Sequence, residues 1–181
     1  VRANADTGVD AAIAMDSGAE GIGLCRTEHQ FMGDRLPLVR RVILSHDFDA
    51  EEAALAALAD AQREDFRDLL RAVGDRPVTV RLLDAPMHEF LPASGAHAED
   101  EHQARMLEHM HEENPMLGVR GVRLALMHEG LYPAQVEGLF NAWVDVVSAG
   151  DARPELEVMI PLVSIPDELL MMLRLIRRVN Q

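Results

Sequence analysis

The sequence is poor in the features that mark several common classes of protein. Among its 181 residues there is one cysteine, Cys25, so an internal disulfide and a CxxC metal or redox site are both excluded. No apolar run reaches the length needed to cross a membrane, and no charged-then-apolar leader opens the chain. These absences predict a globular, cytoplasmic protein with no membrane contact.

The sequence also lacks any concentration of positive charge. Its formal net charge is −14, and its basic residues form isolated pairs such as Arg40–Arg41 rather than a stripe. Because a surface that binds nucleic acid needs such a stripe, we expect no nucleic-acid partner.

Several short catalytic motifs are absent as well. The sequence contains no GxGxxG, GxxxxGK[ST], GxSxG or HExxH element, which excludes the standard dinucleotide, P-loop, hydrolase-elbow and zinc-protease sites. His109 and His111 are two positions apart on a predicted helix, so their side chains diverge and a metal site there is not favoured.

What the sequence does contain is an alternation of short apolar runs with longer segments of helical period. The runs predict strands at residues 1–5, 21–25, 77–83, 118–124 and 155–163. The intervening periodicity predicts helices from Thr7 to Gly18, from Asp49 to Gly74, over 103–112, over 136–147, and from Ser164 onward. In the last of these we expect four residues to face inward: Leu169, Leu170, Leu173 and Ile176.

Strands that alternate with helices in this way indicate a parallel α/β fold. An open doubly wound sheet and a (β/α)8 barrel both fit the alternation. Because an eight-unit barrel takes about 250 residues, five strands would make an incomplete one. The first and last residues both fall within predicted elements, so we expect residues 1–181 to form a single, incomplete domain.

Three arginines lie in or at the ends of predicted strands: Arg26, Arg81 and Arg120. Reactive groups gather at the carboxyl ends of strands in parallel α/β folds. A guanidinium group offers a planar fork that matches phosphate and carboxylate oxygens. If the three forks converge, they suit a small polyanion or a phosphoryl group in transfer.

The alternative is that each arginine pairs with a structural acid, such as Glu28, Asp84 or Glu113. Spacing alone favours this alternative, because half-buried arginines usually have an acidic partner. Cys25 precedes Arg26 on a strand, so its side chain points to the opposite face, and we expect it to pack in the core.

Longer blocks of the sequence carry a resemblance to a known family. "NADT", "GAEGIGLCRTEHQFM", "VTVRLLDAPMHEFLP", "EENPMLGVRGVRL" and "LEVMIPLV" follow one another in this order. Together they resemble the C-terminal, phosphoenolpyruvate/pyruvate-binding domain of the pyruvate phosphate dikinases, which are PEP-utilising enzymes. Phosphoenolpyruvate synthase and enzyme I of the sugar phosphotransferase system share the "RTE" and "NPxLGxR" elements.

The resemblance implies a (β/α)8 TIM-type barrel, truncated here to roughly its first five β/α units. It also implies a phosphotransferase as the parent enzyme. In that family a phosphohistidine on a swivelling domain donates its phosphoryl group to pyruvate enolate, and the overall reaction converts ATP, phosphate and pyruvate into AMP, pyrophosphate and phosphoenolpyruvate. The implied partners are pyruvate or phosphoenolpyruvate and the swivelling domain of the same parent chain, within a homo-oligomer.

The resemblance also assigns residues. Arg26, Arg81 and Arg120 match the family's substrate-binding arginines, with Glu28 and Asp84 expected behind them and Glu28 holding Arg26. The family's Mg2+ ligands and its acid/base cysteine lie on later strands. The 181 residues are therefore expected to contain no catalytic or metal-binding residue and to be inactive alone.

Two departures from the family pattern remove no charged ligand: Ala85 stands where proline is usual, and Gln30 where methionine is usual. The sister enzymes stay open as alternatives, as does a non-catalytic module that keeps only the anion site.

Overall fold

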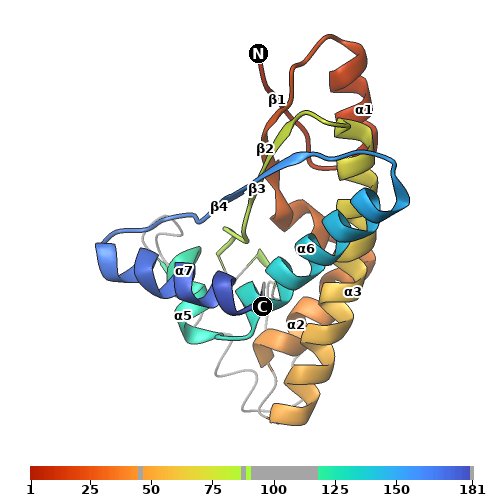
Figure 1. The fold of residues 1–181 in the computed structure, drawn as a ribbon. Helices are drawn as coiled ribbons and strands as arrows, with labels where there is room; N and C mark the ends of the chain where they lie inside the picture. The colour runs from red at the N-terminus through yellow and green to blue at the C-terminus, as the bar shows by residue number, and fades with distance from the viewer. Residues whose placement is uncertain (45–46, 87–88, 91–117, 180–181) are drawn as a thin grey trace.

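The computed structural model describes residues 1–44, 47–86, 89–90 and 118–179 (Figure 1). Its sheet has four parallel strands in the order β1-β2-β3-β4, so each strand pairs with the next one along the chain. The sheet is not closed. The strands are β1 (Ala3–Asn4), β2 (Ile22–Arg26), β3 (Pro77–Arg81) and β4 (Glu155–Met159).

Helices connect the strands, as the alternation predicts. They are α1 (Gly8–Asp16), α2 (Leu36–Leu44), α3 (Phe48–Val73), α5 (Val122–Met127), α6 (Leu131–Ala149) and α7 (Pro166–Val179), with two short 3-10 turns, η1 (Thr27–Phe31) and η2 (Gly33–Arg35), after β2. The side chain of Thr7 accepts a hydrogen bond from the Asp10 backbone N–H at 3.1 Å, which confirms the predicted start of α1. None of the helices that the structure describes is both long and apolar enough to cross a membrane.

Two sequence predictions are wrong. Residues 118–124 form no strand, because α5 begins at Val122 and buries Val122 and Leu124 in the core. Of the four residues expected to face inward on α7, the three leucines are 37–49 % exposed, whereas Ile176 is partly buried against a core cluster; Met172 is the buried residue of that helix. The predicted helix over 103–112 lies outside the described residues.

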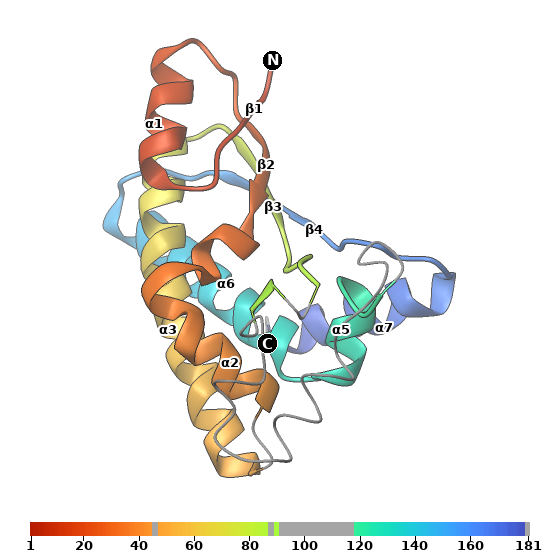
Figure 2. The same cartoon turned by 180° about the vertical axis from the view of Figure 1, so that it is seen from behind.

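One hydrophobic cluster covers a single face of the sheet and joins it to α1, α3 and α6 (Figures 1 and 2). β3 contributes Val78 and Val80, which alternate with side chains of the opposite face, and β2 contributes Ile22 and Cys25, between which the β2–β3 register shifts. Cys25 is fully buried here, which confirms its packing role, and burial raises the pKa of its thiol to about 12.

The opposite face of the sheet is polar. Arg2 donates to Glu157 of β4 at 2.7 Å, and Thr79 of β3 donates to the same carboxylate at 2.5 Å. These hydrogen bonds from Arg2 and Thr79 hold the pKa of Glu157 below its usual range. The two faces of the sheet therefore differ in kind, one packed by helices and the other crossed by an ion pair.

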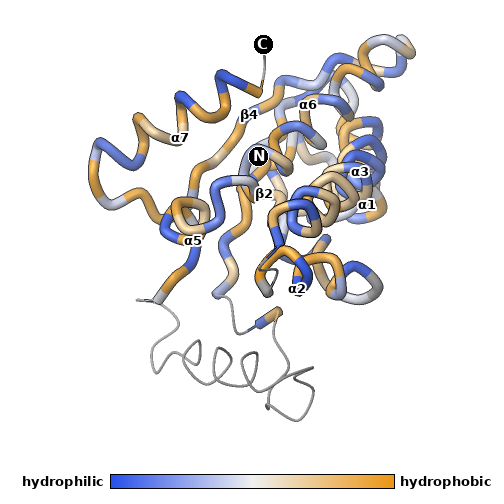
Figure 3. The backbone as a smooth tube through the Cα atoms, turned by 90° about the horizontal axis from the view of Figure 1, so that it is seen from below, coloured by the Kyte–Doolittle hydropathy of each residue, from blue (hydrophilic) through white to orange (hydrophobic). Residues whose placement is uncertain are grey.

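α3 and α6 lie side by side over the apolar face, and Figure 3, seen from below, shows α7 at the far side of the molecule, beyond β4. The α3–α6 contact depends on a close backbone approach at Gly138. A Cβ atom at that position would lie 2.7 Å from the backbone oxygen of Ala59 in α3.

We predict that Gly138→Ala destabilises the protein, although alanine favours a helix over glycine by about 1 kcal/mol. Forcing α6 away from α3 costs about 1–3 kcal/mol by overpacking, which outweighs that gain. Urea unfolding measures the difference, with Glu137→Ala, an exposed neighbour on α6, as the control. An increase in stability of about 1 kcal/mol for Gly138→Ala would contradict the close approach.

Candidate functional site

The carboxyl edge of the sheet places two of the three arginines side by side. Arg26 is the last residue of β2 and Arg81 the last residue of β3, and the two are register partners in the parallel ladder. The side chain of Arg26 is 41 % exposed and that of Arg81 is 20 % exposed. Both guanidinium groups thus lie at the edge where a parallel sheet gathers its loops.

Asp6, the second residue after β1, holds Arg26. Its Oδ2 accepts from the Arg26 Nη2 at 2.7 Å and Nε at 3.1 Å, and its Oδ1 accepts from the Arg26 backbone N–H at 2.7 Å. Burial acts to raise the pKa of Asp6, but the hydrogen bonds from Arg26 outweigh it and the pKa lies below its usual value. The prediction that Glu28 holds Arg26 is wrong, because Asp6, in the segment that follows β1, makes the hydrogen bonds to the Arg26 side chain.

Glu28 instead pairs with Arg81, whose Nη2 donates to Glu28 Oε1. Asp84, on the other side, lies 3.4 Å from Arg81 Nη1 and accepts from Arg120 Nε at 2.9 Å. Arg120 also donates from Nη2 to the backbone oxygen of Asp84 at 2.7 Å. Asp84 therefore joins Arg81 to Arg120, which makes it the supporting acid that the sequence predicts.

Arg120 reaches this edge from the segment that precedes α5, and not from the end of a strand. Gly121 follows it with φ +58°, and a Cβ atom there would lie 3.1 Å from the backbone oxygen of Pro161. The Val122 N–H donates to that same oxygen at 3.2 Å. These contacts fix Arg120 beside the chain that leaves β4, so the structure brings all three predicted arginines to one edge.

The three arginines and their three carboxylates balance in formal charge. Binding of an anion at this edge would therefore depend on directed N–H donors rather than on net charge. Arg81 Nε is buried without a hydrogen-bond partner among the described residues, as is Glu28 Oε2. Buried donors of this kind are rare in folded proteins, so Arg81 Nε retains capacity for an incoming oxygen atom.

Behind the arginines lies a buried polar layer that includes residues of α6. Gln135 Nε2 donates to Thr27 Oγ1 at 3.1 Å, and Gln135 Oε1 accepts from the Leu83 N–H at 2.9 Å. Tyr132 donates to the Leu83 backbone oxygen at 2.9 Å, and burial raises the pKa of its hydroxyl. Sequence reasoning missed these groups, because a lone amide or phenol within a helix gives no signal of what it contacts.

Asp6 was missed as well, although a signal existed. It follows the first predicted strand within the "NADT" block, so its carboxylate lies at the same edge as Arg26.

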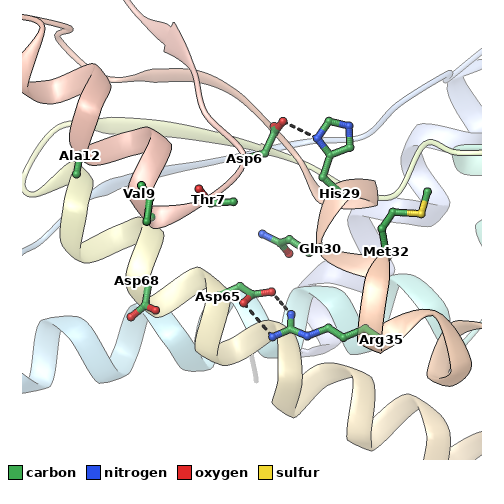
Figure 4. A pocket seen from close by; sticks show the side chains of 11 residues that line it. Asp6, Thr7, Val9, Ala12, His29, Gln30, Met32, Arg35, Asp65 and Asp68 are labelled. Carbon is green, nitrogen blue, oxygen red and sulfur yellow. Dashed lines mark hydrogen bonds and ion pairs between the residues drawn. The ribbon is translucent and has the colours of Figure 1, made fainter.

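A cavity of about 650 Å3 lies on the other side of Asp6, between α1, the turns after β2, and α3 (Figure 4). His29 Nδ1 contacts Asp6 Oδ2 at 2.7 Å at its rim, and Arg35 pairs with Asp65 across its floor. Gln30 also lines the cavity, and its amide oxygen accepts from Gln62 Nε2 at 3.0 Å. The glutamine that replaces the family's usual methionine therefore has a hydrogen-bond partner. Neither Arg81 nor Arg120 lines this cavity.

Within the part of the chain that the structure describes, no three histidine, cysteine, aspartate or glutamate side chains are grouped so as to hold a metal ion.

Comparison with known proteins supports the resemblance seen in the sequence. Residues 1–181 match the profile of the PEP-utilising enzyme, PEP-binding domain. The chain is 41 % identical over 179 residues to pyruvate, phosphate dikinase of Rickettsia bellii, an alignment that covers 93 % of this chain and 20 % of that protein. It is 43 % identical to the chloroplastic enzyme of Mesembryanthemum crystallinum, with 100 % and 20 % covered, and 42 % identical to that of Giardia intestinalis, with 99 % and 21 % covered.

The chain thus spans about a fifth of the length of the curated relatives that it matches. Because the match to the profile runs over its whole length, the chain belongs to the family of PEP-utilising enzymes, within their PEP-binding domain.

Proposed function

We propose that the chain forms the arginine-bearing part of the phosphoenolpyruvate/pyruvate site of a pyruvate phosphate dikinase. The observation that carries the proposal is the cluster at the sheet edge, where Arg26 and Arg81 are register partners and Asp84 joins Arg81 to Arg120. In the forward reaction the phosphoryl group leaves an imidazole nitrogen of a phosphohistidine and bonds to the enolate oxygen of pyruvate, which gives phosphoenolpyruvate and free histidine.

We propose further that the sheet is the first part of a (β/α)8 barrel. The strand order shows no reversal, whereas a doubly wound sheet reverses its order at a switch point. Helices pack on one face while the other carries the Arg2–Glu157 pair, as expected for the outside and the inside of a barrel. This arrangement favours the barrel over the open sheet among the two folds that the sequence permits.

In this proposal the three guanidinium groups bind the phosphoryl and carboxylate oxygens of the substrate. Because the transferring phosphoryl group carries spread negative charge, fixed donors stabilise it most when they need no reorganisation. Three carboxylates hold the donors in place, because each accepts a hydrogen bond from an arginine and limits the rotation of its guanidinium group. These are Asp6, Glu28 and Asp84. Arg81 Nε offers a donor that no described residue uses.

The remaining parts of the proposed reaction lie outside this chain's described residues. A swivelling phosphohistidine domain and an ATP-binding domain would belong to the same parent chain, within a homo-oligomer. Mg2+, held by residues of later strands, would supply charge neutralisation at the enolate and phosphoryl oxygens. The curated relatives reported above are all named pyruvate, phosphate dikinase, so phosphoenolpyruvate synthase, enzyme I and a non-catalytic module are not favoured.

We predict that Arg81→Ala in the full-length enzyme lowers phosphoenolpyruvate formation at least about 100-fold, which is the usual loss for one preorganised donor. Phosphorylation of the histidine by ATP should be unchanged, because it takes place in another domain. Arg81→Lys keeps the charge but loses the fork, so it should lose most of the activity too. Radiolabelled ATP measures the first half-reaction, and coupled detection of phosphoenolpyruvate measures the second.

Arg63→Ala is the matched control for this experiment. Arg63 also makes a bidentate ion pair: its Nε and Nη2 each donate to an oxygen of Asp145 at 2.7 Å. This pair joins α3 to α6 and includes no residue of the strand ends. An exposed pair of this kind contributes little to stability, so the variant should keep its activity. Equal loss of both half-reactions in Arg81→Ala, together with loss of fold, would show that Arg81 is only structural.

We predict a different signature for Asp6→Asn. The amide has one acceptor oxygen in place of two, so it cannot accept from both the guanidinium group and the backbone N–H of Arg26 in the present geometry. The fork therefore turns more freely and kcat falls about tenfold, the effect of a slightly misplaced donor. KM should not rise, because removing a carboxylate makes the edge more positive. Steady-state kinetics of the full-length enzyme separate the two constants, with Asp145→Asn as the control; a higher KM at unchanged kcat would contradict this role.

The same variant gives a test in pH. Because the pKa of Asp6 is lowered in the folded protein, its pairing stabilises the fold above the unfolded pKa of about 4 and is lost as the pH falls below it. The stability difference between wild type and Asp6→Asn in urea unfolding should therefore shrink between pH 7 and pH 3. A difference that stays constant would show that the ion pair contributes nothing.

A further inference from the structure

Gln135 is one of two glutamines that the structure places fully out of solvent, the other being Gln62. Both polar atoms of the Gln135 side-chain amide have a partner: Nε2 donates to Thr27 Oγ1 at 3.1 Å and Oε1 accepts from the Leu83 backbone N–H at 2.9 Å. Gln62 differs, because its Oε1 is buried without a partner among the described residues. Burying an amide costs free energy unless its polar atoms are hydrogen-bonded, so the two hydrogen bonds indicate that Gln135 connects these segments of the chain.

The connection joins the ends of β2 and β3 on the side of the arginines. Thr27 directly follows Arg26, and its hydroxyl donates to the backbone oxygen of Arg81 at 3.0 Å. Gln135 donates to that same hydroxyl, so a chain of two hydrogen bonds runs from α6 to the residue that carries the Arg81 side chain. The Gln135 amide orients the Thr27 hydroxyl, which in turn donates to the Arg81 carbonyl, so loss of the amide loosens both contacts.

The other half of the amide fixes the chain that leads to Asp84. The Leu83 N–H donates to Gln135, and the Leu83 oxygen accepts from Tyr132 one turn earlier on α6. Both backbone groups of the residue before Asp84 are therefore held by side chains of one helix. The carboxylate of Asp84 lies at the end of that segment, where it meets Arg81 and Arg120.

We propose that Gln135 is a positioning residue for the anion site: it sets the relative placement of Arg81 and Asp84 from behind and does not touch the substrate. This inference rests on the proposed function. It predicts that a change at Gln135 acts on phosphoryl transfer through the geometry of the arginine forks, with no loss of charge at the site.

The first variant is Gln135→Met in the full-length enzyme, which keeps the length of the side chain and removes both hydrogen bonds. Displacement of a reacting group by about 1 Å costs up to about 100-fold in rate, so kcat/KM for phosphoenolpyruvate should fall between tenfold and 100-fold. ATP-dependent phosphorylation of the histidine should be unchanged. Gln62→Met is the matched control, since it removes the other buried amide and should leave both half-reactions as in wild type.

The second variant, Gln135→Glu, separates positioning from simple stability. A protonated carboxyl group both accepts from the Leu83 N–H and donates to Thr27, whereas an ionised one can only accept. The ratio of variant to wild-type activity should therefore rise as the pH falls. The charges of Asp84, Arg81 and Glu28 act on Tyr132, one turn earlier on α6. We expect the same groups to act on a carboxyl group at position 135, where the two acids disfavour its ionised form and Arg81 favours it.

The outcomes separate this inference from the function that it rests on. If Arg81→Ala abolishes phosphoenolpyruvate formation while Gln135→Met retains wild-type kinetics, the positioning role is wrong and the proposed function stands. If Arg81→Ala keeps wild-type activity, the proposed function itself fails. A rate ratio for Gln135→Glu that does not change with pH, measured in folded enzyme, would also overturn the positioning role.

Discussion

The contact of the Asp84 carboxylate with both Arg81 and Arg120 is the interaction on which the site depends. It joins the end of β3 to a segment that precedes α5, 36 residues further along the chain. Two guanidinium groups brought together would otherwise repel, and the shared carboxylate offsets that repulsion in a half-buried setting. Arg26 completes the set from the adjacent strand, where Asp6 plays the corresponding part.

The rest of the fold serves to hold this edge in place. α3 and α6 pack over the apolar face of β2 and β3, and the buried layer of Gln135, Tyr132 and Thr27 carries that rigidity from α6 to the strand ends. A catalytic site built on strands and supported by a second layer of hydrogen bonds keeps its geometry better than one built on loops alone. The side chains of Arg81 and Arg120 are 20 % and 18 % exposed, and that of Arg26 is 41 % exposed.

The sequence predicts the features that depend on local signals and misses those that depend on contacts between distant residues. Strand β3 and the caps Thr7 and Gly74 were predictable, because propensity and capping are local. Residues 118–124 were misread as a strand, because a short apolar run has no period long enough to tell a strand from a buried helix. The three arginines were identified by resemblance, and Asp84 was named as a supporting acid. The partner of Arg26 was not found: Asp6 rather than Glu28 holds it, a contact between distant residues that sequence spacing does not reveal.

The central claim is that three arginines from separate segments act on one anion, and a double-mutant cycle tests it most directly. Arg26 contacts Asp6 and Arg120 contacts Asp84, so the two arginines have different supporting acids, and a cycle measured on ligand binding reports the coupling that the bound ligand adds. Calorimetric binding of phosphoenolpyruvate to full-length wild type, Arg26→Lys, Arg120→Lys and the double variant should give a coupling energy above about 0.5 kcal/mol. Additive effects within about 0.3 kcal/mol, or no effect of either substitution, would contradict a shared anion site.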